Sequence, residues 1–199
     1  MARLFFAIIL TVALQGIASA QQGRPAPSSD LPPGAKVLPP PVTLDALYKQ
    51  LRTARDPNEA RPIAKQIEQR WMRSGSDTTN LLMDRVLEVM SAKAYDTGLE
   101  LLDHILQLQP NWAEAYAKRA TLLFLMDDYD GAMRDLRAVL AREPRHFSAL
   151  AGLGMIWQRL GKPKAAYAAY QKVLEVYPHL VEVREIVDRM RPEVEGREL

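Results

Sequence analysis

The residues in this sequence that are best suited to chemistry are three histidines, His104, His146 and His179. No two of them share a spacing typical of metal ligands, and there is no cysteine to join them. The helical pattern described below places His146 and His179 at joints between helix pairs and His104 on an outer helix. We expect surface or helix-capping histidines, with His146 in an exposed joint beside Arg145.

Two further groups of residues superficially resemble ligand sites. The run Gly152-Leu153-Gly154 has no strand before it and no third glycine after it, so close helix packing explains it better than phosphate binding. Asp127, Asp128 and Asp130 lie in a short turn, where aspartates end one helix and cap the next, and the turn is too short for calcium ligation. The sequence therefore predicts no catalytic, cofactor or metal site, and a protein that is not an enzyme.

The composition narrows the function further. The chain has 199 residues, with 26 Lys and Arg against 24 Asp and Glu and no Cys. A net charge of +2 is far from the concentrated basic excess of proteins that bind nucleic acid, so we expect no nucleic-acid partner. Without cysteine there is no disulfide, no thiolate nucleophile and no Cys-ligated zinc.

Residues 1–20 have the pattern of a secretory signal peptide. Arg3 precedes an apolar run from Leu4 to Leu14, and Ala18-Ser19-Ala20 places small residues where a signal peptidase cleaves. The apolar run is about half of the roughly 20 residues needed to span a bilayer. We expect cleavage after Ala20, a periplasmic or secreted protein, and no stable membrane insertion after cleavage.

Residues 21–41 contain half of the prolines of the chain. Each proline removes a backbone donor and restricts the residue before it to extended conformations. The segment is predicted to be a disordered, semi-rigid linker. A ligand for an aromatic groove on another protein is the alternative interpretation.

The remainder of the chain repeats a pattern every 34 residues. Pro110, Pro144 and Pro178 each follow an apolar helical stretch. A small residue lies twelve positions before each proline, at Gly98, Ala132 and Ala166. Polar or helix-ending residues fill 93–96, 127–130 and 161–164. Each unit is thus expected to be a helical hairpin with a tight turn.

This period and pattern resemble the tetratricopeptide repeat. The resemblance covers three copies, residues 79–112, 113–146 and 147–180. The middle copy carries the signature at Tyr116, Ala120, Tyr129, Ala132, Leu136, Val139 and Pro144. Arg85 and Arg119 stand where leucine is usual, and Gly98 where alanine is usual. The resemblance implies an all-α fold, a superhelical stack of helix-turn-helix hairpins.

Both ends of the stack are predicted to carry extra helices. Residues 42–78 contain two amphipathic segments, which we interpret as a degenerate N-terminal hairpin, with a capping hairpin as the alternative. Residues 181–199 begin with a helix of alternating apolar and charged residues, followed by a tail. An open stack needs a polar-faced terminal helix, and this segment is predicted to be that C-terminal capping helix.

The resemblance also implies a concave face formed by the first helix of each hairpin, on which a protein or peptide partner would bind. The residues expected to project into it are Asn80, Met83, Asp84, Leu87, Met90, Glu114, Ala117, Lys118, Thr121, Phe124, Ser148, Ala151, Gly152, Met155, Gln158 and Arg159. The alternative is that these residues pack between neighbouring helices or under the terminal helix. A clamp for two carboxylates is not expected, although Lys118 and Arg159 are candidates to hold one acidic side chain.

The sequence therefore predicts an exported protein-interaction module that binds a peptide or helix of a partner, in a cell-envelope assembly of a Gram-negative organism. No cofactor is expected. Two alternatives are a scaffold that self-associates through Trp157 or the terminal helices, and a non-catalytic subunit of an envelope enzyme. The identity of the partner and the oligomeric state are left open.

Overall fold

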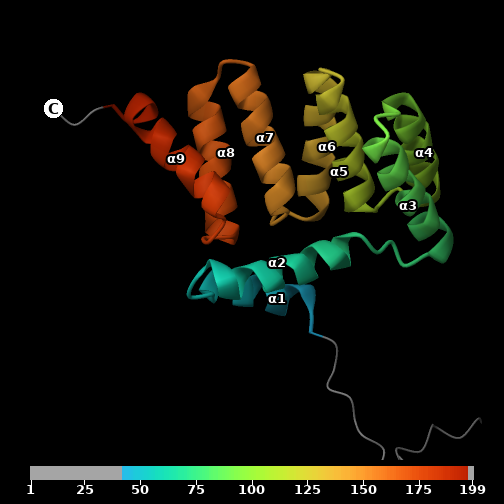
Figure 1. The fold of residues 1–199 in the computed structure, drawn as a ribbon, viewed down its shortest axis with the longest axis horizontal. Coiled ribbons are helices and arrows are strands. Elements are labelled where there is room, and N and C mark those ends of the chain that lie inside the picture. Colours follow the sequence, from blue (N-terminus) through green and yellow to red (C-terminus); the bar gives the residue numbers. More distant parts are fainter. Residues whose placement is uncertain (1–41, 197–199) are drawn as a thin grey trace, which may run out of the picture. The chain divides into compact units, whose positions relative to one another are not determined.

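The computed structural model describes residues 42–196, and the predicted signal peptide and proline-rich linker lie outside them. The described part of the chain is entirely helical apart from its turns (Figure 1). The helices are α1 Leu44–Thr53, α2 Pro57–Trp71, α3 Asp77–Ser91, α4 Tyr95–Leu108, α5 Ala113–Leu125, α6 Tyr129–Arg142, α7 Phe147–Arg159, α8 Pro163–Val176 and α9 Val181–Val194. The predicted all-α fold is confirmed.

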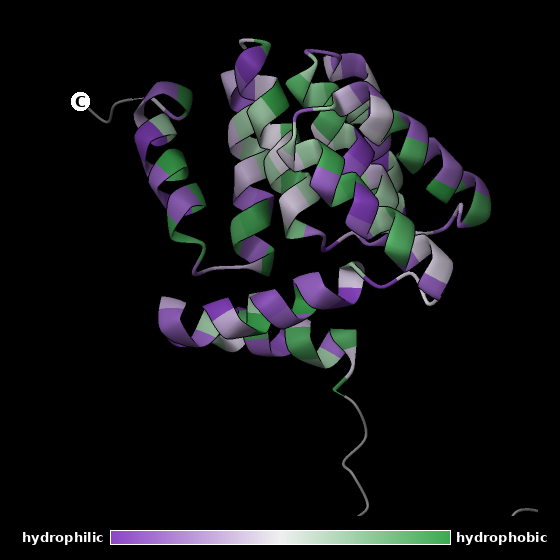
Figure 2. Cartoon of the chain, turned by 45° about the vertical axis from the view of Figure 1, so that its right-hand side comes forward, coloured by the Kyte–Doolittle hydropathy of each residue, from purple (hydrophilic) through white to green (hydrophobic). Residues whose placement is uncertain are grey.

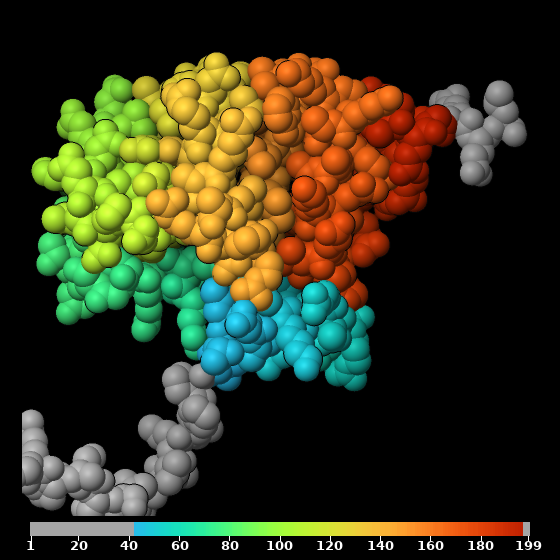
Figure 3. Space-filling view, turned by 180° about the vertical axis from the view of Figure 1, so that it is seen from behind, coloured from blue at the N-terminus to red at the C-terminus, as the bar shows by residue number. Residues whose placement is uncertain are grey.

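The helices α3 to α8 form three hairpins that stack side by side in chain order (Figure 1). The first helices of the pairs, α3, α5 and α7, lie on one side of the stack. The second helices, α4, α6 and α8, follow one another across the opposite side, which Figure 3 shows from behind. The helix α9 packs against α8 and ends the stack.

The turn inside each hairpin repeats the 34-residue period in its backbone. The first helix of each hairpin is followed by a residue in the left-handed conformation, with φ angles of 58° at Lys93, 61° at Asp127 and 65° at Gly161. Only Gly161 takes this conformation without a steric cost, since it has no Cβ. The next helix then begins at once, and at α6 the side chain of Asp128 accepts a hydrogen bond from the Gly131 N–H at 2.8 Å. The expected capping role in this turn is confirmed for Asp128.

Small residues allow neighbouring helices to approach closely, both within a hairpin and between successive hairpins. A Cβ added at Gly154 would lie 2.5 Å from the ring of Tyr170 on α8, and one added at Gly98 would lie 2.7 Å from Leu122 on α5. Ala132 and Ala166 are fully buried at equivalent places. The glycines of α7 therefore serve packing, as the sequence analysis predicted.

The N-terminal hairpin, α1 and α2, does not continue the stack before α3. It lies across the ends of the hairpins, and Figure 1 shows α2 running beneath α5, α7 and α8. Its apolar residues share one core with residues of α7, α8 and α9, whereas α3, α4 and part of α5 form a separate core. The amphipathic segments were therefore predicted correctly as helices, but they do not serve as an extra repeat or cap before α3.

The solvent-facing surfaces of α2 and α9 are mostly polar. Figure 2 shows hydrophilic residues predominating along α2 and alternating with apolar ones along α9. The apolar residues Val183, Val187 and Met190 of α9 are buried. Within residues 42–196, no helix has the length and apolar character needed to cross a bilayer.

Candidate functional site: a groove between the repeats and the N-terminal hairpin

A groove of about 870 Å³ lies where the first helices of the second and third hairpins meet the N-terminal hairpin. One side is the concave face of α5 and α7, and the other is α2. The joint between α8 and α9 closes one end with Tyr177 and Leu180. The groove is therefore built from the repeat stack together with a helix that crosses it.

Trp71, the last residue of α2, determines where α2 lies. Its ring stacks on the imidazole of His146 with 3.7 Å between ring centroids and 12° between planes, and it also contacts Phe147. The Trp71 carbonyl accepts a hydrogen bond of 2.7 Å from the indole N–H of Trp112. Trp112 lies where α4 connects to α5, and His146 and Phe147 lie where α6 connects to α7. This end of α2 is therefore attached to two successive connections between hairpins.

Polar contacts attach the N-terminal hairpin as well. At the turn between α1 and α2, His179 Nε2 donates a hydrogen bond of 2.7 Å to the Ala54 carbonyl. At the opposite end, where α1 begins, the Arg145 guanidinium lies 2.7 Å from the Asp45 carboxylate and 4.1 Å from the ring centroid of Tyr48. The hairpin is thus held at both of its ends by residues from the joints between repeats.

His146 is 1% exposed, so the expectation that it lies in an exposed joint is wrong. The N-terminal hairpin covers this joint, which local sequence does not reveal. His146 caps α7, because the Ala149 N–H donates to its Nδ1 at 3.2 Å. The other ring nitrogen, Nε2, must then carry the proton that it donates to Glu114 at 3.1 Å. The predicted capping role is confirmed.

Glu114 connects His146 to the groove. Its carboxylate is buried and also lies 2.8 Å from the Lys118 ammonium, one turn along α5. Burial favours the neutral acid, but the hydrogen bonds from His146 and Lys118 outweigh it and hold the pKa of Glu114 below its ordinary value. Across the groove, burial and then the charge of Glu114 raise the pKa of Glu68. Lys118 is therefore already paired, and Arg159 does not line the groove with it.

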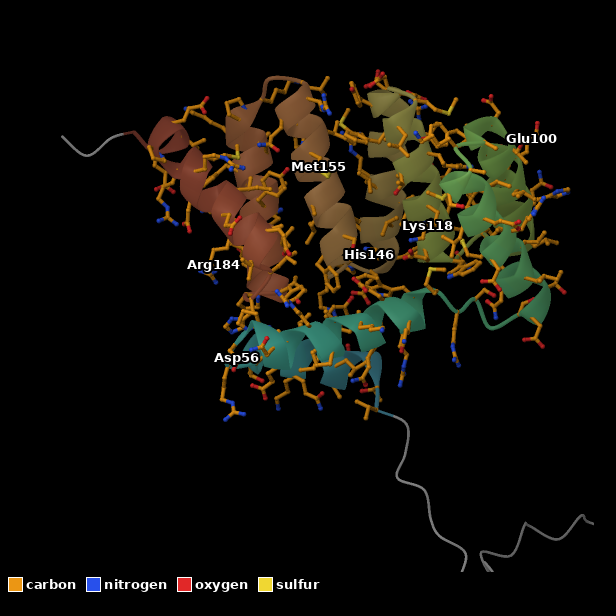
Figure 4. The ribbon with its side chains drawn as sticks, in the orientation of Figure 1. Asp56, Glu100, Lys118, His146, Met155 and Arg184 are labelled. Carbon is orange, nitrogen blue, oxygen red and sulfur yellow. The ribbon has the colours of Figure 1, made fainter. Side chains whose placement is uncertain are left out.

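The part of the groove farther from α2 is apolar and open. Met155 is 46% exposed and Phe124 is partly buried, resting against Tyr129 at 5.6 Å between ring centroids. Between them the wall is made of small residues, Ala151 and Gly152, and a Cβ added at Gly152 would lie 3.2 Å from Leu136. Figure 4 shows Met155 higher on α7, with His146 and Lys118 nearer to α2.

The structure brings nine of the predicted concave residues together in this groove. They are Glu114, Ala117, Lys118, Thr121, Phe124, Ser148, Ala151, Gly152 and Met155. All come from α5 and α7, because only these first helices are opposite α2.

The other predicted residues lie elsewhere. Met83 is 1% exposed in the core between α3, α4 and α5, so its prediction as a groove residue is wrong. Gln158 accepts a hydrogen bond of 2.7 Å from the Tyr170 hydroxyl and contacts Met190 of the terminal helix. The rest do not line the groove, and they are Asn80, Asp84, Leu87, Met90 and Arg159.

The sequence analysis missed the contribution of α2. Its groove face consists of Arg61, Ala64, Lys65, Glu68, Trp71 and Met72. The spacing of three and four residues identifies one face of a helix. This pattern was available in the sequence, but nothing in it indicated that the face lies against α5 and α7.

Other candidates for chemistry do not form a second site. No cluster of three or more histidines or carboxylates is arranged to hold a metal ion among residues 42–196. Trp157 is partly buried between two core clusters, with Lys162 over its ring at 5.1 Å. Arg119, at a usual leucine place, pairs with Asp135 at 2.7 Å and with Asp103 at 2.7 Å. It therefore links three helices through charge instead of apolar packing.

Comparison with known proteins places these features among relatives. The family model described as tetratricopeptide repeat matches residues 147–180. A TPR repeat-containing protein of Rhizobium etli is 37% identical over 157 residues, which is 79% of this chain and 77% of that protein. The small glutamine-rich tetratricopeptide repeat-containing protein 2 of Saccharomyces cerevisiae is 29% identical over 89 residues, 45% of this chain and 26% of that protein.

Solved structures of similar fold include two that contain peptides. The first TPR of Spaghetti (RPAP3), bound to an HSP90 peptide, has a TM-score of 0.55 and 18% identity, covering 59% of this chain and 93% of that one. The Yersinia enterocolitica secretion chaperone SycD, in complex with a peptide of the translocator YopD, has a TM-score of 0.53 and 14% identity, covering 61% of this chain and 92% of that one. At these identities the likeness concerns the fold.

Proposed function

Because the chain belongs to the tetratricopeptide-repeat family, we propose that it is a protein-interaction module that binds a segment of a partner protein in the groove between α5, α7 and α2. The observation that carries this proposal is an apolar wall made of the partly buried Phe124 and the exposed Met155, set in a groove of about 870 Å³. Binding sites are typically concave and mostly apolar, with a few polar groups that fix orientation. Glu114 and Lys118 supply such polar groups here.

The structural neighbours support a peptide as the class of ligand. Spaghetti and SycD were each solved with a peptide of another protein. Methionine adapts its shape to different partners, so Met155 suits a surface that accepts a segment of another chain. In this proposal the protein acts by binding and has no catalytic role.

The test uses a photo-crosslinking amino acid placed in the groove. At Thr121, which is exposed and lines the groove, we expect a crosslink to a partner protein that mass spectrometry identifies. The matched control is Thr97, an exposed threonine on the outer helix α4. Equal crosslinking of the same proteins from both positions would contradict the proposal.

Two substitutions show whether the apolar wall is responsible. Phe124→Glu with Met155→Glu should abolish the Thr121 crosslink, since burying carboxylates against an apolar partner is unfavourable. Leu81→Glu with Leu108→Glu is the control, because these leucines are 71% and 56% exposed and do not line the groove. Circular dichroism establishes that both variants are folded.

We further propose that the protein acts after export, in the cell envelope, with residues 21–41 as a tether. The signal-peptide pattern of residues 1–20 supports export. N-terminal sequencing of the protein from fractionated cells should find a mature chain that begins at Gln21. A cytoplasmic protein that retains Met1 would contradict this part of the proposal.

A further inference from the structure

The face of α2 that lines the groove carries two cations whose charge is not neutralised within the stack. Arg61 and Lys65 are one turn apart and exposed, and neither forms an ion pair within residues 42–196. Both belong to the N-terminal hairpin, outside the three repeats. The groove therefore has a cationic edge that the concave face of the repeats does not supply.

The carboxylates that line the groove do not neutralise this edge. Glu114 is occupied by His146 and Lys118. Glu68 is the other acid, and it forms no ion pair with Arg61 or Lys65 within residues 42–196. The lining thus contains three cations, Arg61, Lys65 and Lys118, and two acids, so its net charge is positive.

The apolar wall and the cationic edge are separated by a distance that a short peptide can span. Met155 lies nine residues along α7 from His146, about 13 Å at about 1.5 Å per residue, and His146 stacks on Trp71 at the end of α2. Lys65 and Arg61 lie back along α2 from Trp71 by roughly 9 and 15 Å. Because α2 crosses beneath α7 (Figure 1), the path from Met155 is about 16 Å to Lys65 and about 20 Å to Arg61, which about five or six extended residues span at about 3.3 Å each. Figure 4 shows this order, with Met155 above His146 and Lys118.

We propose that the partner of this groove is an internal protein segment with a large apolar side chain and, about five or six residues away, one or two carboxylates. The apolar side chain packs between Phe124 and Met155, and the carboxylates pair with Arg61 and Lys65 on α2. Recognition depends on acidic side chains and not on a free carboxyl terminus, because the cations lie along one edge of the groove. This inference rests on the proposed function and names the chemistry of its partner.

The experiment selects peptides from a random 12-residue library displayed on phage, with the full chain as the bait. Each peptide is joined to the coat protein through its carboxyl end, so no free peptide carboxylate is present. We expect enriched peptides to carry Asp or Glu about five or six positions from Leu, Phe, Met or Trp. Enriched peptides without acidic residues would overturn the inference, and so would a selection that enriches nothing.

Charge reversal on α2 then tests where the acidic residues bind. Arg61→Glu with Lys65→Glu should weaken binding of a synthetic selected peptide about tenfold in fluorescence anisotropy, which corresponds to about 1.4 kcal/mol for the loss of both exposed ion pairs. Changing the acidic residues of the peptide to lysine should restore binding to this variant. Lys164→Glu with Lys172→Glu, on exposed positions of the outer helix α8, is the control and should leave binding unchanged.

Different results would contradict the acidic specificity of the groove and its role as the peptide-binding site. If charge reversal on α2 leaves the affinity unchanged while Phe124→Glu with Met155→Glu abolishes binding, the groove binds peptides but the acidic specificity is wrong. If the selected peptides bind the Phe124 and Met155 variant as tightly as the original protein, the groove is not the binding site, and both proposals are overturned.

Discussion

Replacing Trp71 by alanine should release the N-terminal hairpin from the repeat stack. Trp71 is 9% exposed and stacks on His146 at 3.7 Å. Removal of a buried tryptophan side chain costs about 3–5 kcal/mol, of which the aromatic stack accounts for about 1 kcal/mol. We expect the free energy of unfolding to fall by about 3 kcal/mol, because α2 can relax toward the groove and fill part of the space.

The assay is urea unfolding followed by circular dichroism, combined with amide hydrogen exchange. Exchange in α1 and α2 should accelerate far more than exchange in α5 and α6, because Trp71 belongs to the core that joins the hairpin to α7, α8 and α9. The contacts of His179 with Ala54 and of Arg145 with Asp45 remain, and they limit how far the hairpin moves.

Trp71→Phe is the matched control. Phenylalanine keeps an aromatic ring opposite His146 and removes the indole N–H, which is buried without a hydrogen-bond partner among the described residues. An unsatisfied buried donor is itself unfavourable, so the loss of stability should be less than about 1 kcal/mol. The reasoning is refuted if Trp71→Ala costs less than about 1 kcal/mol, or if exchange accelerates equally in all helices.

Three other substitutions test single contacts. Glu114→Gln should lower stability by about 2 kcal/mol at pH 7, the value of hydrogen bonds to a buried charge. Since the pKa of Glu114 is lowered on folding, wild-type stability should fall as the pH drops below 4.5, and the difference between the two proteins in urea titrations should narrow as the pH falls. Arg119→Leu should lower the free energy of unfolding by about 3 kcal/mol, because it leaves the buried Asp135 carboxylate unpaired. Adding Asp135→Leu should recover most of this loss in thermal unfolding, and no recovery would mean that the charges do not act as a pair. Gly154→Ala should lower the melting temperature despite the better helix propensity of alanine, because the added methyl group overlaps the Tyr170 ring. An unchanged or higher melting temperature would show that α7 and α8 are not packed this closely.

The three hairpins were predictable because their causes are local in the chain. The small residues and prolines recur every 34 residues, and the helix-ending residues of each turn repeat with them. In the structure the same period sets the left-handed residues Lys93, Asp127 and Gly161. The part of the groove made by α5 and α7 followed from this repeat, so residues such as Phe124 and Met155 were found from the sequence.

The rest of the groove was not predictable from local pattern. The amphipathic sequence of α2 establishes that it is a helix with an apolar face, but several surfaces of the stack offer an apolar face to cover. The contact between Trp71 and His146 decides among them, and these residues are 75 positions apart in the chain. The burial of His146 and the removal of Met83 from the concave surface also depend on how whole helices pack.

The sequence alone therefore determined the helices, their pairing and the order of the stack, since each depends on neighbours within one or two repeats. The tertiary structure alone decided that the N-terminal hairpin crosses the stack and adds Arg61 and Lys65 to the groove. The physical reason is that docking of the hairpin depends on the complementarity of distant surfaces. The hydrogen bond between His179 and Ala54 spans 125 positions, and no repeating pattern records such a contact.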